Sequence, residues 1–192
     1  MTTSAPSPAT RRRHPQSPAV AVVVATLAAC TGAPAHETST VSVADRRPAA
    51  SSEHDAAVER DVKRVRAATA PYRVLDSAVA VGYPREVRSC IEHLPRGAMG
   101  FHHVNRALLD DQLEIHRPEI LLYARTAAGD YKLTGVEFIV PYTARPRDAE
   151  PPTVMGQKLK RSDSLKLWYL HVWAWEENPS GLFADWNPAV KC

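Results

Sequence analysis

Histidine and glutamate side chains in three separate segments carry the candidate chemistry of this chain. His102 and His103 are adjacent, Glu137 follows in an apolar run, and His171 lies among aromatic residues. Neighbouring side chains of an extended segment point to opposite faces, so at most one of His102 and His103 can share a face with His171. Two imidazoles and one carboxylate bind zinc or non-haem iron and leave coordination positions open. These four residues are therefore candidate ligands of a divalent metal.

Other interpretations of the same residues stay open at this point. Their spacing matches no established metal motif, so the histidines are also consistent with hydrogen bonding inside a polar pocket. Glu137 and His171 are chemically suited to general acid and base catalysis without a metal. Asp185 and His93 are further candidates for a fourth ligand.

Aromatic residues around His171 suggest a binding surface. Tyr169, His171 and Trp173 alternate in an extended segment and share one face, and aromatic walls suit a small ligand. The alternative is that these large side chains fill the core. We expect the ligand-binding residues to include His102, His103, Glu137, Tyr169, His171 and Trp173.

The N-terminal region has the three parts of an export signal. Arg11–Arg13 form a basic head, an apolar run covers residues 19–29, and Cys30 follows. The run is too short to span a bilayer core of about 30 Å. Leu27-Ala28-Ala29-Cys30 resembles the lipobox of bacterial lipoproteins. An ordinary cleaved signal or a retained apolar segment are the alternatives.

The lipobox resemblance implies a location in the cell envelope. Residues 1–29 are removed in that class, Cys30 receives acyl chains such as palmitate, and the protein is held on a membrane. Gly32 stands where an inner-membrane retention signal has Asp, which favours the outer membrane if there is one. Several acyl chains anchor a protein stably, whereas one does not.

Charge argues against nucleic acid as a partner. The chain has 24 basic and 21 acidic side chains, but three arginines leave with the signal, so the mature chain is neutral. A nucleic-acid-binding domain is expected to carry a basic surplus. The membrane, a small ligand or an envelope protein remain as expected partners.

Two cysteines remain if Cys30 is lipidated. Cys90 and Cys192 are an even pair in an exported chain, which predicts a disulfide. The alternative is a redox or metal-binding thiol pair, which the absence of a Cys-x-x-Cys motif disfavours.

The periodicity of the remaining chain predicts one α+β domain over residues 52–192, preceded by a disordered tether over residues 30–51. A valine-rich helical stripe begins at Val58, and Pro71 indicates one kinked helix or two helices meeting near Thr69. Four extended segments should form a mainly antiparallel sheet of about four strands, followed by an irregular tail. The predicted strands are residues 100–105, 119–125, 132–140 and 167–175.

Alternation assigns the faces of that sheet. Val136, Phe138 and Val140 should face the helix, whereas Leu133 and Glu137 should share the opposite face with His171. A turn is expected at residues 127–130, and a short helical turn at residues 108–113.

Several short sequence segments, taken together, are similar to an uncharacterised family of exported bacterial proteins. The resemblance covers residues 72–192 and implies a grouping, with no activity or ligand. These segments are residues 97–105, 117–123, 135–137, 170–173 and 178–188.

The combined expectation is an envelope lipoprotein that binds a small ligand or partner at its polar-aromatic sheet face. One alternative is a metal-dependent or acid/base enzyme that uses the same histidines and glutamate. A second alternative is a structural envelope protein. Convergence of His102 or His103 with Glu137 and His171 within about 5 Å distinguishes a site from scattered surface residues.

Overall fold

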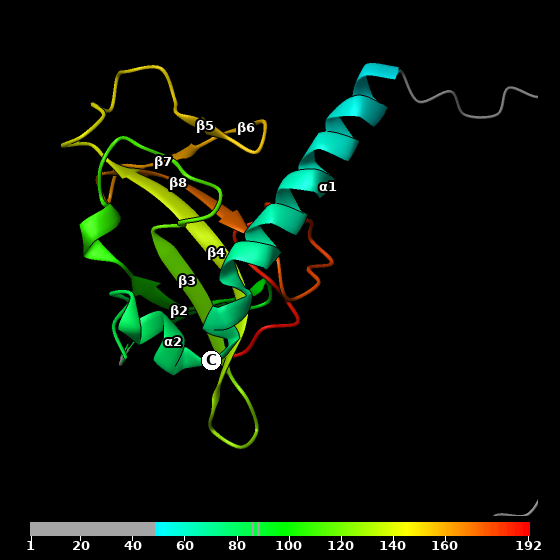
Figure 1. The fold of residues 1–192 in the computed structure, drawn as a ribbon, viewed down its shortest axis with the longest axis vertical. Helices are drawn as coiled ribbons and strands as arrows, with labels where there is room; N and C mark the ends of the chain where they lie inside the picture. The colour runs from blue at the N-terminus through cyan, green and yellow to red at the C-terminus, as the bar shows by residue number, and fades with distance from the viewer. Residues whose placement is uncertain (1–48, 86, 88) are drawn as a thin grey trace, which may run out of the picture. The chain divides into compact units, whose positions relative to one another are not determined.

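A computed structural model describes residues 49–85, 87 and 89–192. These residues belong to one compact unit, which is coloured from cyan to red in Figure 1. The predicted signal peptide, Cys30 and most of the predicted tether lie outside the described residues.

The N-terminal helical segment consists of three pieces. Helix α1 spans Ala49–Thr69, the 3-10 helix η1 spans Ala70–Arg73, and helix α2 spans Leu75–Ala80. The predicted break near Thr69 is confirmed, because η1 contains Pro71, which cannot continue the hydrogen-bond ladder of α1. No helix in the described part of the chain is long and apolar enough to cross a membrane.

The first helix begins three residues before Ser52, where the domain was expected to start. Helix α1 begins at Ala49, so Ser52 lies inside the helix rather than at its start. Ala49 and Ala50 are strong helix formers and extend the helix toward the N-terminus.

The predicted α+β class is confirmed, but the sheet is larger than the four strands expected. Six antiparallel strands lie in the order β1-β2-β3-β4-β8-β7, and β5 and β6 form a separate pair. The short 3-10 helix η2, Arg106–Leu108, follows β2. The strands are β1 Cys90–His93, β2 Gly97–Val104, β3 Ile120–Arg125, β4 Tyr131–Pro141, β5 Thr153–Val154, β6 Gln157–Lys158, β7 Lys160–Ser162 and β8 Leu167–Val172.

Helix α1 packs against one face of the curled sheet, as Figure 1 shows. Val62 and Val65 of α1 are buried with the side chains of β4 and β8 that the alternation assigned to this face. Those strand residues are Val136, Phe138, Val140, Trp168, Leu170 and Val172.

A β-bulge in β4 makes one predicted side-chain orientation, that of Leu133, wrong. Tyr123 pairs with Leu133 while Leu122 pairs with Gly135, so Thr134 is an extra residue in β4. An extra residue reverses the alternation on either side of it. Leu133 consequently lies in the cluster that faces α1, not beside Glu137 as the uninterrupted period predicted.

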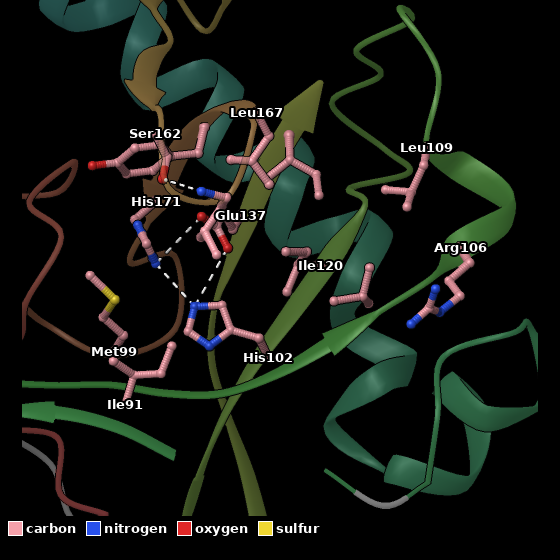
Figure 2. A pocket seen from close by; sticks show the side chains of 14 residues that line it. Ile91, Met99, His102, Arg106, Leu109, Ile120, Glu137, Ser162, Leu167 and His171 are labelled. Carbon is pink, nitrogen blue, oxygen red and sulfur yellow. Dashed lines mark hydrogen bonds and ion pairs between the residues drawn. The ribbon is translucent and has the colours of Figure 1, made fainter. Parts of the chain in front are cut away.

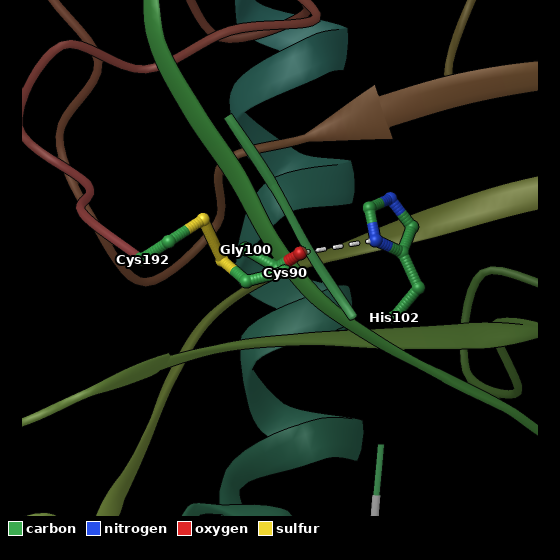
Figure 3. The surroundings of a disulfide bond; sticks show 4 residues. All are labelled: Cys90, Gly100, His102 and Cys192. Atoms are coloured by element: carbon green, nitrogen blue, oxygen red, sulfur yellow. Dashed lines mark hydrogen bonds between the residues drawn. A yellow bond between two sulfur atoms is a disulfide. The ribbon is translucent and has the colours of Figure 1, made fainter. Parts of the chain in front are cut away.

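The disulfide between Cys90 and Cys192 is confirmed (Figure 3). It joins the edge strand β1 to the C-terminal segment. That segment also pairs with β2, because Ala98 and Asn187 exchange two backbone hydrogen bonds. The C-terminal segment is therefore fixed against the β1–β2 edge of the sheet by covalent and hydrogen bonds.

Candidate metal centre at the base of an apolar pocket

Three side chains converge on the sheet face that lies away from α1. Glu137 of β4 and His171 of β8 are directly paired across the two strands. His102 comes from β2, on the far side of β3, and the curl of the sheet brings its ring over the pair. One ligand atom from each of the three residues lies within 4.8 Å of the other two.

The distances within this cluster have the size expected of a shared cation. The Nε2 atoms of His102 and His171 are 3.4 Å apart. A Glu137 carboxylate oxygen lies 3.5 Å from His102 Nε2 and another lies 3.7 Å from His171 Nε2 (Figure 2). Two nitrogen ligands about 2.1 Å from a tetrahedral metal are about 3.4 Å apart. Both glutamate contacts are longer than a normal hydrogen bond.

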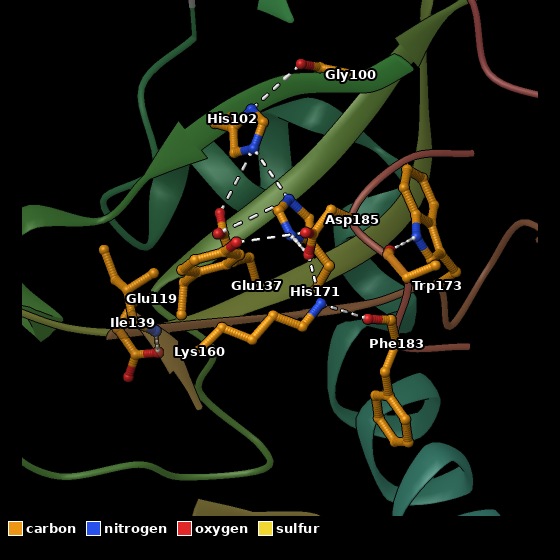
Figure 4. Close-up of polar contacts among 12 residues, drawn as sticks. Gly100, His102, Glu119, Glu137, Ile139, Lys160, His171, Trp173, Phe183 and Asp185 are labelled. Carbon is orange, nitrogen blue, oxygen red and sulfur yellow. Dashed lines mark hydrogen bonds and ion pairs between the residues drawn. The ribbon is translucent and has the colours of Figure 1, made fainter. Parts of the chain in front are cut away.

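The Nδ1 atoms of the two histidines, on the outer side of each ring, have different surroundings. His102 Nδ1 lies 3.2 Å from the carbonyl oxygen of Gly100, which fits an N–H donor at Nδ1 and leaves the Nε2 lone pair directed at the cluster. His171 Nδ1 lies 3.8 Å from Asp185 Oδ1, which is too long for a direct hydrogen bond. Lys160 and Tyr169 each donate a hydrogen bond to the Asp185 carboxylate (Figure 4).

Electrostatics favour an uncharged His102 and an ionised Asp185. Burial lowers the pKa of His102, and the opposing attraction of Glu137 is weaker. Burial by itself raises the pKa of Asp185, but contacts with His171 and Lys160 outweigh it and lower that pKa to about 2. A neutral imidazole beside a carboxylate is the form in which histidine binds metals.

The cluster forms part of the wall of a cavity of about 580 Å³. This volume is within the range of small-molecule sites, which are mostly apolar with a few polar groups. Ile91 and Leu165 are exposed to solvent, with 42% and 68% of their surface accessible. The walls are aliphatic apart from His102, Arg106, Glu137, Ser162, Tyr169 and His171.

Of the six residues expected to bind a ligand, four line the cavity and two do not. His102, Glu137, Tyr169 and His171 all line the cavity. His103 is buried on the opposite face, where its Nδ1 lies 2.7 Å from the carbonyl oxygen of Pro84. Its neighbour in sequence therefore supplies the histidine of the cluster, and His103 lies outside the metal site.

Trp173 lies behind the cluster rather than in the cavity. Its ring is stacked on that of His171, with centroids 6.4 Å apart, and its Nε1 donates to the carbonyl oxygen of Ala184. The strand predicted to reach Trp175 ends at Val172, so Trp173 leaves the alternation and packs with Ala98 and Val190.

The two further candidates for a fourth ligand are outside the cluster. His93 packs against Trp186, with ring centroids 5.3 Å apart. Asp185 approaches His171 from the side of the ring that faces away from the other ligand atoms. At 3.8 Å from Nδ1 it is too far away for a direct hydrogen bond to His171.

The cavity also contains residues that the sequence analysis missed. Val104 follows His102 by two residues in β2, so the alternation of that strand was the signal that could have found it, whereas Arg106 lies beyond the strand in η2. Ile91 and Leu165 had no such signal, because β1 was not predicted and Leu165 lies in a turn.

Comparison with known proteins yields no family for this chain, since no family model, curated protein or solved structure matches it.

Proposed function

We propose that the domain binds one divalent transition metal through His102, Glu137 and His171, and that the cavity above the metal holds a small, largely apolar ligand. The observation that carries the proposal is the convergence of the three groups: the two Nε2 atoms are 3.4 Å apart, and each lies 3.5 or 3.7 Å from a different oxygen of the Glu137 carboxylate. These distances fit a face of a metal coordination shell better than a network of hydrogen bonds.

Hydrogen bonds alone cannot satisfy all three groups of the cluster, whereas a metal ion can. His102 Nδ1 is placed to donate to Gly100, so His102 Nε2 is an acceptor in the neutral ring. His171 Nε2 could donate to only one of its two neighbours, and the Glu137 carboxylate would remain without a short partner. A cation accepts electron pairs from all three groups. Two nitrogens and one carboxylate favour zinc or ferrous iron.

Open coordination positions favour a metal-dependent enzyme as the second candidate function. Among the described residues the cluster supplies three ligands, and structural zinc sites have four. Remaining positions would face the cavity, where a metal-bound water or ligand can be activated.

The metal proposal is tested by metal analysis of the full-length protein purified without a histidine tag. After loading with zinc or ferrous iron and removal of the excess, about one ion per chain is expected. His102→Ala and His171→Ala should each lose the ion. His103→Asn is the matched control, because it alters the adjacent histidine and keeps a donor toward Pro84. Equal metal content in wild type and His171→Ala would overturn the proposal.

We also propose that the protein is exported and anchored to a membrane of the cell envelope through lipidated Cys30. The Leu-Ala-Ala-Cys pattern supports this, and disulfides such as Cys90–Cys192 persist mainly outside the cytoplasm. Labelling of growing cells with palmitate should label the wild type and a Cys90→Ser/Cys192→Ser variant. Cys30→Ser should lose both the label and the membrane fraction, and a label retained in this variant would refute the lipid anchor.

A further inference from the structure

The lining of the cavity includes the three residues of the metal cluster and one charged residue outside it, Arg106. His102, Val104 and Arg106 all line it and follow one another at steps of two residues. Extended residues advance about 3.3 Å each, so the backbone positions of His102 and Arg106 are separated by at most about 13 Å. The cavity thus extends along β2 from the cluster to the start of η2.

Aliphatic side chains make up most of the cavity wall between His102 and Arg106. Val104 is paired with Ile120 across β2 and β3, and both line the cavity together with Ile139 of β4. Leu109, on the same side of the cavity as Arg106 in Figure 2, and Leu167 also line it. A ligand that extends from His102 to Arg106 must therefore have an apolar body.

Arg106 is a charged residue in the cavity wall, and its neighbour in sequence holds the backbone at this point. The preceding residue, Asn105, caps η2 by accepting from the backbone N–H of Ala107 and donates to the carbonyl oxygen of Val81. The Arg106 side chain is exposed and forms no ion pair with any residue that the structure describes. A guanidinium is suited to bind a carboxylate through two parallel hydrogen bonds.

We infer that the cavity takes a medium-chain carboxylic acid, whose carboxylate pairs with Arg106 and whose aliphatic body lies along β2 toward the cluster. The inference rests on the proposed function in one respect only: the proposed metal centre forms part of the cavity wall. The pairing with Arg106 needs no metal. Arg106 is then the residue that selects an anionic ligand over a neutral one of the same length.

The test is calorimetric titration of the full-length protein with decanoate, decan-1-ol and decylamine, with binding to detergent alone subtracted. Wild type should bind decanoate at least about tenfold more tightly than decan-1-ol, which corresponds to about 1.4 kcal/mol. Arg106→Gln should abolish this preference and leave the decan-1-ol affinity unchanged. Arg106→Glu should reverse the preference toward decylamine. Arg60→Gln, an exposed arginine on α1 outside the cavity, should behave as wild type.

Two outcomes overturn the inference: wild type without a preference for decanoate, or Arg106→Gln with an unchanged decanoate affinity. Metal content, measured on the same samples, separates this failure from that of the proposed function. A protein that binds metal but shows no preference disproves only the role of Arg106. A protein that binds no metal but keeps an Arg106-dependent preference disproves only the metal centre.

Discussion

The two adjacent histidines, His102 and His103, show which properties of single residues could be predicted from the sequence. The alternation of an extended segment required that only one of His102 and His103 reach Glu137 and His171, and the structure agrees. Which of the two does so was not predictable, because it depends on the register of β2 against β3. His103 is instead a core residue between the rings of Tyr123 and Tyr131.

A second buried acid gives a prediction about stability. Glu119 is 1% exposed and accepts a hydrogen bond from the backbone N–H of Ile139. Burial raises the pKa of this carboxyl from 4.5 to about 8. The folded state therefore holds a proton that the unfolded state releases near pH 4.5. The stabilisation from that proton is complete below the unfolded pKa and is lost as pH rises through about 8.

Glu119→Gln should remove this pH dependence. Relative to wild type, the variant should gain stability as pH is raised from about 5 to about 9, by at most roughly 5 kcal/mol from the size of the pKa shift. Denaturant unfolding at a series of pH values measures the difference. Glu150→Gln, which alters a surface carboxyl paired with Lys158, is the control and should show no such trend. A difference between Glu119→Gln and wild type that does not vary with pH would show that Glu119 is not protonated in the folded state.

At the scale of elements, long strands were predictable and short ones were not. The cores of β2, β3, β4 and β8 coincide with the four predicted segments, because each has at least six residues and shows either alternation or, in β3, a continuous apolar run. Strands β1 and β7 have four and three residues and lie at the two edges of the sheet, so no periodicity marks them. The bulge at Thr134 was hidden for a different reason: it depends on how β4 pairs with β3, not on the composition of β4 alone.

The disulfide at the edge strand β1 is expected to affect both stability and ligand binding. The first residue of β1, Cys90, is bonded to Cys192, and the second, Ile91, lines the cavity. The disulfide closes a loop of sequence separation 102, for which loop entropy gives a stabilisation of at most about 5 kcal/mol. Cys90→Ser/Cys192→Ser should therefore unfold at lower denaturant concentration and bind decanoate more weakly.

The metal content of that double variant should stay at the wild-type level, because all three proposed ligands lie on β2, β4 and β8. Cys30→Ser serves as the control, with unchanged stability. Equal unfolding midpoints for the double variant and wild type would show that hydrogen bonds such as those between Ala98 and Asn187 are sufficient to hold this edge.

For the whole molecule, the sheet separates the core from the candidate site. One face is covered by α1 and carries most of the buried apolar side chains, and the other carries the cavity and its polar cluster. The sequence predicted this division, since it follows from alternation within β4 and β8. It did not predict the strand order, because the placement of β8 beside β4 depends on contacts between segments far apart in the chain.

The parallel stacking of Trp173 on His171 makes the candidate site optically observable. Indole emission responds to the charge and polarisation of a neighbouring ring, and the Trp173 N–H is held by the carbonyl oxygen of Ala184. Coordination of an ion by His171 would therefore alter the fluorescence of an indole that does not itself line the cavity. The protein contains a spectroscopic reporter of its own proposed metal centre, and no added dye is needed to follow the occupancy of that centre.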